Sequence, residues 1–434
     1  MQKRTPRNLI VSFSGASLTH FGGICLLQFF FKRLTLRKQL RHYLYFPQRN
    51  NRYSVSEAIL ALIYPISLGL GRLETTHLLK HNGVFQYLTG LPAYPDPTTL
   101  RRFLLRMAPL ALSRLRRFHD RLLLSMIVKP KAPTKVIFDL DSTVLILYGK
   151  QEMARIGYNP QKWGRPSYHP LLCFNGITKD FWHGELRPGD TYTATGTVEL
   201  LKAVFAKLPS SVKSVIIRAD KGFYDHETIE YLESNKALFV IVAKLTAPVK
   251  RTISTLSYQI HSSGLETAEF MYQPTKWKKE YRFVVVRRLI PEDPTEQLTL
   301  FSMGKYSYQV IVTNTKLTPL HVWRFYNGRA AVELIIKELK GDYPLAKIPT
   351  KHFAANEAYF HTLLFSYNLI NWFKRLCLPK EFQNMTLKTL RARLLLIPGE
   401  LVRSKNRPTL KLPTNLLYKN AFEYALNRLE KLQF

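Results

Sequence analysis

Residues 136–141 read Val-Ile-Phe-Asp-Leu-Asp, and residues 144–147 read Val-Leu-Ile-Leu. β-Branched and aromatic side chains dominate both runs, which is typical of buried β-strands. Residues 225–233 have the pattern of a helix, and further strands are expected at 171–177, 212–218 and 238–242. The order strand, helix, strand predicts an α/β core.

The chain before this core has mostly helical patterns. Apolar residues recur at helical spacing over 26–44 and 55–70, and Ser54 or Ser56 is placed to cap the second helix. Residues 130–133, Pro-Lys-Ala-Pro, indicate a linker to the core. Short helices with such joints suit either a DNA-binding unit or a plain helical bundle.

The chain after residue 250 changes character again. Strand-like runs with polar breaks indicate a β-rich insertion, and they lie at 281–289, 298–303 and 309–313. Helices are then expected at 319–340, 356–376 and 421–432. These patterns divide the chain into a helical domain at 1–128, an α/β core at 129–249 and 321–380, the β-rich insertion at 250–320, and a basic C-terminal region at 381–434.

The charge of the chain points to a polyanionic partner. Lys and Arg number 64 against 30 Asp and Glu, a formal net charge of +34 over 434 residues. Such a field attracts phosphate-bearing polymers and favours salt-dependent binding. The basic residues spread along the whole chain instead of forming one tail, which favours nucleic acid over a membrane surface.

The three cysteines and the apolar runs exclude several protein classes. Cys25, Cys173 and Cys377 lie far apart with no Cys-x-x-Cys pair, so neither a disulfide framework nor a zinc ribbon is expected, and a reducing cytoplasm fits. The apolar stretch 9–31 follows a basic start, but serines and a Gly-Gly pair interrupt it, so we expect folded protein. Residues 359–378 predict an amphipathic core helix. No membrane partner is therefore expected.

Candidate chemistry begins with two strand-end aspartates. Asp139 and Asp141 lie two residues apart, so they share one face of the first strand. Asp220 ends the strand at 212–218 and is followed by Lys-Gly-Phe, the place where α/β sheets carry functional groups. An aspartate at this point can also simply cap the next helix.

The helix expected at 319–340 carries the third carboxylate. At about 100° per residue, Tyr326, Arg329, Glu333, Lys337 and Lys340 fall within roughly 80° of one another on one helix face. The opposite side is apolar. Glu333 and Lys337 alone would suit a solvated face with an ion pair, but that interpretation does not explain why Tyr326 and Arg329 lie on the same face.

These residue types suit phosphodiester chemistry. Two Mg²⁺ ions about 3.5–4 Å apart can assist the entering and leaving oxygens of an in-line displacement. Mg²⁺ prefers hard oxygen ligands and keeps several waters, so a few carboxylates suffice. Arg, Lys and Tyr side chains beside them can bind the neighbouring phosphates.

Taken together, the motifs resemble the bacterial insertion-sequence DDE transposases of the cut-and-paste branch that carry a Y-R-E-K signature. Tyr326, Arg329, Glu333 and Lys340 match that signature in spacing. Residues 139–143, Asp-Leu-Asp-Ser-Thr, are similar to the family's first-aspartate motif, and residues 218–224 to its second. The blocks at 19–23, 157–160 and 164–172 also resemble one branch of the family.

The resemblance implies a ribonuclease-H-like catalytic core with a β-rich insertion and a helical N-terminal DNA-binding domain. It implies Asp141, Asp220 and Glu333 as catalytic metal ligands for two Mg²⁺ ions, which Mn²⁺ can replace. Asp139 stays an alternative to Asp141, which we prefer because it directly precedes Ser-Thr. Cleavage of element ends, hairpin formation and strand transfer would then need no covalent protein–DNA link.

The resemblance also implies DNA contacts outside the carboxylates. Trp277 is a candidate wedge at a DNA hairpin, or an ordinary hairpin-tip aromatic. Arg165, with Trp163 and Tyr168, lies in a basic aromatic loop suited to following a DNA backbone. Arg187 either does the same or holds a turn.

The implied partners are double-stranded DNA, as element terminal repeats and as target, and a second copy in a working homodimer. The implied location is the bacterial cytoplasm, at the nucleoid. Two other interpretations fit the composition: a domesticated DNA-binding protein without catalysis, and a nuclease that cuts without joining. The retained carboxylates argue against the first, and only a strand-transfer assay separates the second.

Overall fold

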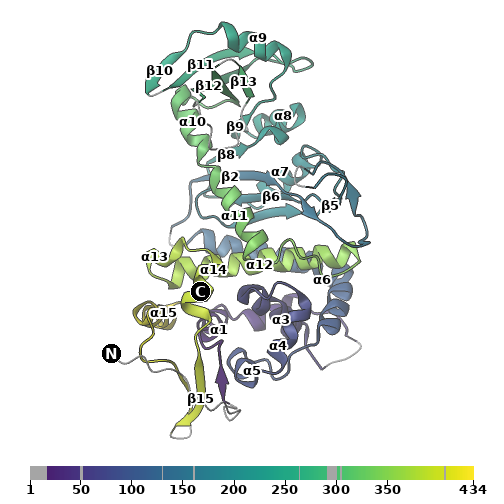
Figure 1. Cartoon of the computed structure of the whole chain (residues 1–434), viewed down its shortest axis with the longest axis vertical. Helices are drawn as coiled ribbons and strands as arrows, with labels where there is room; N and C mark the ends of the chain where they lie inside the picture. Colours follow the sequence, from purple (N-terminus) through teal and green to yellow (C-terminus); the bar gives the residue numbers. More distant parts are fainter. Residues whose placement is uncertain are drawn as a thin grey trace, which may run out of the picture. The chain divides into compact units, whose positions relative to one another are not determined.

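The fold was described from a computed structural model of the chain. It describes residues 17–48, 52–129, 131–159, 162–262, 264–290, 301–303, 305–404 and 407–434. The chain forms two compact units (Figure 1), of which the first contains Met1–His42, Pro47–Leu100 and Phe373–Phe434, and the second contains Tyr43–Phe46 and Arg101–Trp372.

The first unit is mainly helical and joins both ends of the chain. Its elements are α1 (Ile24–Arg33), α2 (Leu36–Tyr43), α3 (Val55–Leu68), η1 (Leu73–Thr76), α4 (His77–Lys80), α5 (Gly83–Thr89), α13 (Lys380–Gln383), α14 (Leu387–Leu390), η3 (Arg391–Leu395), α15 (Lys419–Lys431) and a small sheet of β1 (Leu18–Thr19), β15 (Gly399–Ser404) and β16 (Arg407–Lys411). Phe30 of α1 packs against Phe373 and Phe434, with ring centroids 5.6 and 6.2 Å apart. The C-terminal region therefore shares a core with the first helices.

Local signals explain where these helices start and stop. Ser54 and Glu57 form the capping box of α3, as predicted for Ser54, and Gly69 ends the helix at φ 70°. The single helix expected at 26–44 is wrong, because Thr35 takes φ 48° and separates α1 from α2. No single helix in the described ranges is long and apolar enough to cross a membrane, although the bent pair of α3 with η1 and α4 passes the same test. Residues 1–16 of the basic and apolar start lie outside the described residues.

The second unit is built on a mixed sheet. Its first five strands run in the order β7-β6-β2-β8-β9, and they are β2 (Lys135–Ser142), β6 (Leu171–Asn175), β7 (Phe181–Glu185), β8 (Ser214–Ala219) and β9 (Leu238–Val242). β2, β6 and β7 are antiparallel neighbours, whereas β8 runs parallel to both β2 and β9. The predicted α/β core is confirmed, including the helix α8 (His226–Ser234), whose first turn is capped by Asp225.

Helices and a second small sheet complete this core. The long helices α6 (Pro97–Ile127) and α12 (Phe353–Cys377) meet the edge of the sheet through Asn368, which donates to His119 at 2.7 Å and accepts from the backbone of Phe181 at 2.8 Å. α7 (Thr197–Phe205) precedes β8. The strands β3 (Leu145–Ile146), β4 (Arg155–Ile156) and β5 (Pro166–Tyr168) form a separate three-stranded sheet.

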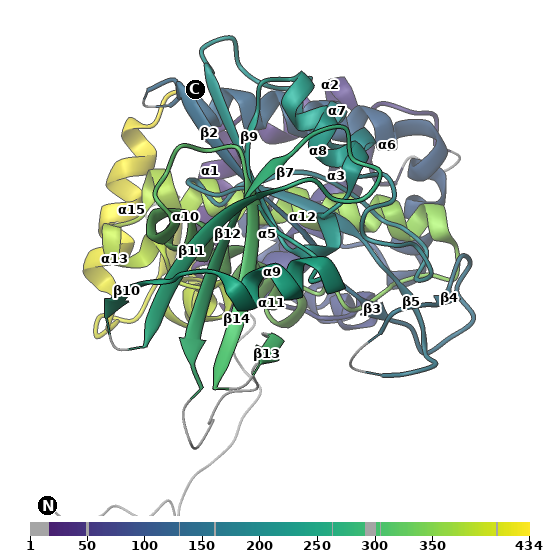
Figure 2. The same cartoon turned by 90° about the horizontal axis from the view of Figure 1, so that it is seen from above.

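The β-rich insertion continues the main sheet instead of forming a separate one. Figure 2 shows its long strands side by side: β10 (Gln259–Ser262), β11 (Leu265–Tyr272), β12 (Tyr281–Leu289) and β14 (Tyr306–Thr313), in the order β10-β11-β12-β14-β9. β13 (Phe301–Met303) pairs with β14, and α9 (Ala247–Thr255) precedes the insertion strands. The strands expected at 281–289 and 309–313 are confirmed, whereas residues 298–300 of the third lie outside the described residues.

The helix expected at 319–340 is broken, and this prediction is corrected. α10 (Pro319–Asn327) and α11 (Ala330–Gly341) are joined by Gly328 and Arg329. At this junction the backbone hydrogen bonds span three residues instead of the four of an α-helix: Arg329 N donates to Tyr326 O and Val332 N to Arg329 O, both at 2.8 Å. A Cβ on Gly328 would lie 2.3 Å from Nη1 of Arg218. The glycine therefore makes room for a guanidinium at the junction.

A buried polar cluster lies between α6, β7 and α12. Burial lowers the pKa of His119 to about 3 and that of His183 to about 2, and it lowers the pKa of His361 well below its usual value. The positive charge of Lys207 lowers all three further; Lys207 itself pairs with Asp120 at 2.8 Å. These imidazoles are therefore neutral in the folded protein at neutral and mildly acidic pH.

We expect this cluster to make stability pH-dependent. An unfolded chain protonates these imidazoles below pH about 6.5 and the folded chain does not, so each lowers stability by about 1.4 kcal/mol per pH unit below that value. The apparent melting temperature should therefore fall between pH 7 and pH 5. His119→Gln should reduce this fall, while His81→Gln, at an exposed position, should not. Equal pH dependence in all three proteins would contradict the assignment.

Candidate active site

Two aspartates lie at the carboxyl ends of neighbouring parallel strands. The register of β2 and β8 pairs Asp139 with Arg218 and Leu140 with Ala219, so Asp141 and Asp220 follow at the same edge. Asp141 is largely buried, with 11% of its side chain exposed, whereas Asp220 is 40% exposed. Asp220 also accepts a hydrogen bond from Gly222 N at 2.8 Å, which fixes its carboxylate at the strand end.

One arginine brings the third carboxylate to this edge. Arg329, at the start of α11, places Nη2 3.1 Å from Asp141 and 3.9 Å from Asp220, and Nη1 3.0 Å from Glu333. Its guanidinium is 4% exposed and also donates to the carbonyl of Leu140. Glu333 remains 66% exposed, at the solvent side of the cluster. The three predicted carboxylates thus converge on one buried cation.

The electrostatics of the cluster follow from burial and close charges. Burial raises the pKa of Asp141 to about 6; the charge of Arg329 lowers it, and the carboxylate of Asp220 raises it. Burial also raises the pKa of Tyr326 to about 12, so this phenol keeps its proton at neutral pH. Burial lowers the pKa of Lys340, and the charge of Asp141 raises it. The negative charge of the carboxylates therefore acts on the pKa of both Lys340 and Tyr326.

Asp139 does not belong to the carboxylate cluster. Its two oxygens accept hydrogen bonds from Nε and Nη2 of Arg218 at 2.6 and 2.8 Å, and both side chains are buried. Nη1 of the same guanidinium donates to the carbonyl of Phe325 at 2.8 Å, close to the α10–α11 junction. A Cβ on Gly176 would lie 2.7 Å from Nη2 of Arg218. This geometry supports Asp141 over Asp139 as the first ligand.

His169 lies in the motif at 164–172, but its position in the sequence did not predict a place at the site. His169 Nδ1 lies 2.8 Å from Thr191 O, and Nε2 lies 3.1 Å from the hydroxyl of Ser142, the residue after Asp141. Ser142 Oγ is also 3.2 Å from the hydroxyl of Thr193. Burial lowers the pKa of His169, so a neutral imidazole supports this loop. A histidine-proline pair after a strand carries no signal of such a contact.

A cleft opens beside Asp220. It has a volume of about 400 Å³ and is lined by Asp220, Lys221, Val242, Ala243, Lys244, Leu245, Lys250, Tyr308, Gln309, Val310 and Tyr326. Three of these side chains are lysines. The cleft therefore offers positive charge and polar groups next to the exposed side of the carboxylates.

Other predicted residues lie away from the carboxylates. Lys337 is exposed and makes no hydrogen bond or ion pair to them within the described ranges. Trp277 packs against Tyr224, with ring centroids 5.1 Å apart, and against His226 and Tyr281. Arg165 is exposed near Tyr148.

Two residues of the predicted DNA-tracking set are structural. Tyr168 is fully buried and donates its hydroxyl to Glu152 O at 2.6 Å. Arg187 is buried and donates to the carbonyls of His169 and Thr195, so it holds a turn. The hypothesis that Tyr168 contacts DNA is therefore wrong, because its ring has no exposed face.

The donor chemistry at the cluster fits a hard divalent cation, since the carboxylate oxygens of Asp141, Asp220 and Glu333 surround one guanidinium. No group of three or more His, Cys, Asp or Glu side chains in the described part of the chain is already spaced to hold a metal. The guanidinium of Arg329 stands among the oxygens instead. A cation entering there must compete with it.

The α/β sheet thus presents two strand-end aspartates to a helix-borne glutamate. The sequence model of one family, described as "Transposase DDE domain group 1", matches residues 1–434, and the chain belongs to this family. It is a transposase enzyme.

Similarity to other characterised proteins is limited. A search of curated proteins finds no match. A cryo-EM structure of the piggyBac transposase synaptic complex with hairpin DNA is similar to this chain, with a TM-score of 0.44 and 12% sequence identity. The alignment covers 99% of this chain and 83% of that one.

We expect the pair of Arg218 and Asp139 to position the site. Arg218→Lys keeps the charge but loses the bidentate contact, which should cost about 1–2 kcal/mol of stability and reduce transposition activity. Arg287→Lys is the matched control, because Arg287 makes a similar pair with Glu266 in the insertion sheet. Activity should be compared well below both melting temperatures. An equal effect of the two variants would refute a positioning role for Arg218.

Arg329 should limit cation binding to the free protein. Removing its guanidinium by Arg329→Ala leaves three carboxylates without their common partner, so Mn²⁺ should bind about tenfold more tightly, equivalent to about 1.4 kcal/mol. Electron paramagnetic resonance titration of Mn²⁺ without DNA measures this directly. Arg324→Ala on the exposed side of α10 is the control and should leave the affinity unchanged. Unchanged affinity in Arg329→Ala would show that the cation binds elsewhere.

Proposed function

We propose that this transposase cleaves the ends of a bacterial insertion sequence and joins them to target DNA by Mg²⁺-dependent hydrolysis and strand transfer. The observation that carries this proposal is the convergence of Asp141, Asp220 and Glu333 on a single buried guanidinium. Their spacing along the chain, with Tyr326, Arg329 and Lys340, supports assignment to the Y-R-E-K group.

The proposed core is ribonuclease-H-like. Three antiparallel strands followed by two parallel ones, in the order β7-β6-β2-β8-β9, support this assignment. The continuation of the sheet into β10–β14 before α11 corresponds to the proposed insertion at 250–320. The remaining proposed regions are a DNA-binding domain at 1–128, core segments at 129–249 and 321–380, and a basic tail at 381–434.

Asp141, Asp220 and Glu333 are the proposed ligands of two Mg²⁺ ions, with Mn²⁺ as a substitute. Bound there, such ions would supply Lewis-acid stabilisation of the phosphate oxygens and activation of water or a 3′-hydroxyl. Asp141 is largely buried and Glu333 is exposed, which supports a site that a DNA strand would reach from the solvent side.

The remaining polar groups would hold the DNA strand in place. Arg329, once withdrawn from the carboxylates, offers a planar fork suited to one phosphate. Lys340 offers a point charge, and the protonated phenol of Tyr326 offers a hydrogen-bond donor. The cleft beside Asp220 would take the strand next to the scissile bond, with its lysines facing the phosphates.

The proposed partner is double-stranded DNA, as terminal repeats and as target, and the +34 formal charge supports it. Paired cleavage of two element ends would need a homodimer, working at the nucleoid in the bacterial cytoplasm. Trp277 remains a proposed wedge at a DNA hairpin. In this conformation its ring is engaged by Tyr224 and His226, so wedging requires it to leave them. Arg165 remains a proposed phosphate contact.

The proposal predicts that Glu333→Gln still binds element-end DNA but neither cleaves nor joins it, with a loss of at least a thousandfold, on the order of 4 kcal/mol. Labelled DNA carrying the terminal repeat, with Mg²⁺, gives the measurement, and chelation should abolish the activity of the wild type. Glu199→Gln is the matched control: its side chain is also 66% exposed, and it pairs with a basic residue nearby on its helix, Lys202, as Glu333 pairs with Arg329. It should leave the activity intact.

Each alternative result has a definite meaning. Equal activity in wild type and Glu333→Gln would remove Glu333 from the site. Cleavage without joining by the wild type would favour a nuclease. Binding without cleavage would favour a domesticated DNA-binding protein.

A further inference from the structure

Three aromatic rings stand exposed near the small sheet of β3, β4 and β5. The exposed fractions are 70% for Tyr148, 76% for Tyr158 and 92% for Trp163. We call these three residues the aromatic face. Large aromatic rings left in water are unfavourable unless they serve a contact, so three of them within sixteen positions of the chain indicate a surface that binds a partner.

The aromatic face lies in a strongly basic segment. Lys150, Arg155, Lys162 and Arg165 fall between β3 and β5, and none of them forms an ion pair with another described residue. Glu152 is the sole acidic residue of 143–179. Its carboxylate accepts from the backbone of Phe353 at 2.9 Å and lies 2.7 Å from His352 Nδ1, so it is already engaged.

Cations and rings meet directly on this face. Lys162 Nζ donates to the hydroxyl of Tyr148 at 3.1 Å and lies 5.2 Å from the centre of its ring. The guanidinium of Arg165 lies 6.0 Å from the same ring. The hydrogen bond and charge of Lys162, together with the charges of Arg165 and Lys347, lower the pKa of Tyr148. Three cations therefore gather around one exposed ring.

Close backbone contacts hold together the small sheet beside the aromatic face. Leu147 N bonds to Pro166 O at 2.9 Å, which ties β3 to β5. Gly157 approaches Gly189 so closely that a Cβ would lie 2.0 Å from its carbonyl oxygen. Tyr168 anchors the segment from beneath by its hydrogen bond to Glu152.

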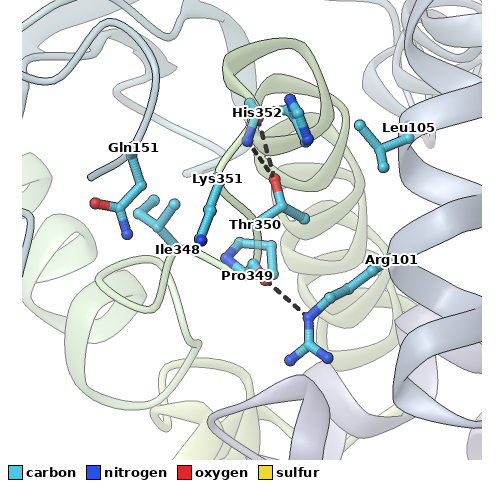
Figure 3. A pocket seen from close by; sticks show the side chains of 8 residues that line it. All are labelled: Arg101, Leu105, Gln151, Ile348, Pro349, Thr350, Lys351 and His352. Carbon is cyan, nitrogen blue, oxygen red and sulfur yellow. Dashed lines mark hydrogen bonds between the residues drawn. The ribbon is translucent and has the colours of Figure 1, made fainter. Parts of the chain in front are cut away.

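A cavity adjoins the segment that carries the aromatic face. It holds about 430 Å³ and is lined by Arg101, Leu105, Gln151, Ile348, Pro349, Thr350, Lys351 and His352. Figure 3 shows Gln151 and Lys351 beside the cavity, with Arg101 bonded to the carbonyl of Pro349 at 3.1 Å. The Gln151 side-chain oxygen is buried with no described hydrogen-bond partner. Glu152 N bonds to Lys351 O at 2.7 Å, so the cavity adjoins the segment that carries the aromatic face.

We propose that the aromatic face binds single-stranded DNA, with unpaired bases stacked on Trp163, Tyr158 and Tyr148. Lys162 and Arg165 would hold the phosphates, and the cavity with Lys351 would receive the next one. Exposed rings among cations suit single strands, because base faces become available only when bases are unstacked and unpaired. A second copy of the chain is disfavoured, since its own cations would meet these. The inference rests on the proposed function, in which cleavage produces unpaired DNA.

The test measures binding without cleavage. The full chain carrying Asp220→Asn is titrated, without divalent metal, into a fluorescent 20-nucleotide strand and into the matching duplex. In this background Trp163→Ala and Tyr158→Ala should each weaken single-strand binding about tenfold, while duplex binding changes less than twofold. Trp163→Phe, which keeps a stacking ring, should retain most of the affinity. Tyr45→Ala is the control, because Tyr45 is a 67% exposed tyrosine outside the face.

Three results would overturn the proposal. Unchanged single-strand affinity in both alanine variants would show that the rings do not stack on bases. Equal losses for strand and duplex would make the face a general electrostatic surface. If the alanine variants lose binding to anionic phospholipid vesicles but keep their single-strand affinity, the aromatic face is a membrane contact. Because no cleavage is read, a failure here is distinct from failure of the proposed transposition chemistry, which the Glu333→Gln assay tests.

Discussion

The repulsion among three carboxylates at one sheet edge is the constraint on which the site depends. Asp141, Asp220 and Glu333 can lie together because Arg329 places a buried guanidinium between them. Without that charge, burial and mutual repulsion would raise the pKa of Asp141 further, and the carboxylates would separate or take up protons. Arg329 belongs to the joint between α10 and α11, so the backbone at that joint decides where the cation stands.

A second ion pair lies on the same two strands, two residues before the aspartates, and holds that joint in place. Asp139 and Arg218 are each two residues before an aspartate of the carboxylate cluster, so the pair shares a sheet face with that cluster. Removing one partner of a buried pair typically costs about 3–5 kcal/mol, whereas the intact pair contributes little net stability. Its value here is geometric: through the carbonyl of Phe325 it fixes α10 and α11 against β2 and β8.

Local patterns predicted more of the fold than of the site. The strands at 238–242 and 281–289 were predictable because branched residues and turn signals mark them, and the cap at Ser54 is a local chemical pattern. The break at Gly328 was not, because the group that lies against this glycine is the guanidinium of Arg218, more than one hundred residues away in sequence. The burial of Tyr168 and the packing of Trp277 on Tyr224 were not predictable either, because both depend on tertiary contacts that local patterns do not encode. The spacing of Tyr326, Arg329 and Glu333 suggested one shared helix face, but the structure reaches that proximity through two helices.

The groups that would attract DNA are different from the groups proposed to act on it. The chain as a whole is strongly positive, and the cleft beside Asp220 is lined with lysines, so on the proposed function a DNA strand would be attracted toward the site. The cluster itself carries three carboxylates against one guanidinium and opposes a phosphate at its centre. A strand can therefore rest beside Asp220, but it reaches the carboxylates only after added positive charge outweighs them. In the free protein the guanidinium of Arg329 pairs with the carboxylates, and once released it suits a phosphate. Binding of a metal cation at the carboxylates would therefore release Arg329 to bind the DNA strand.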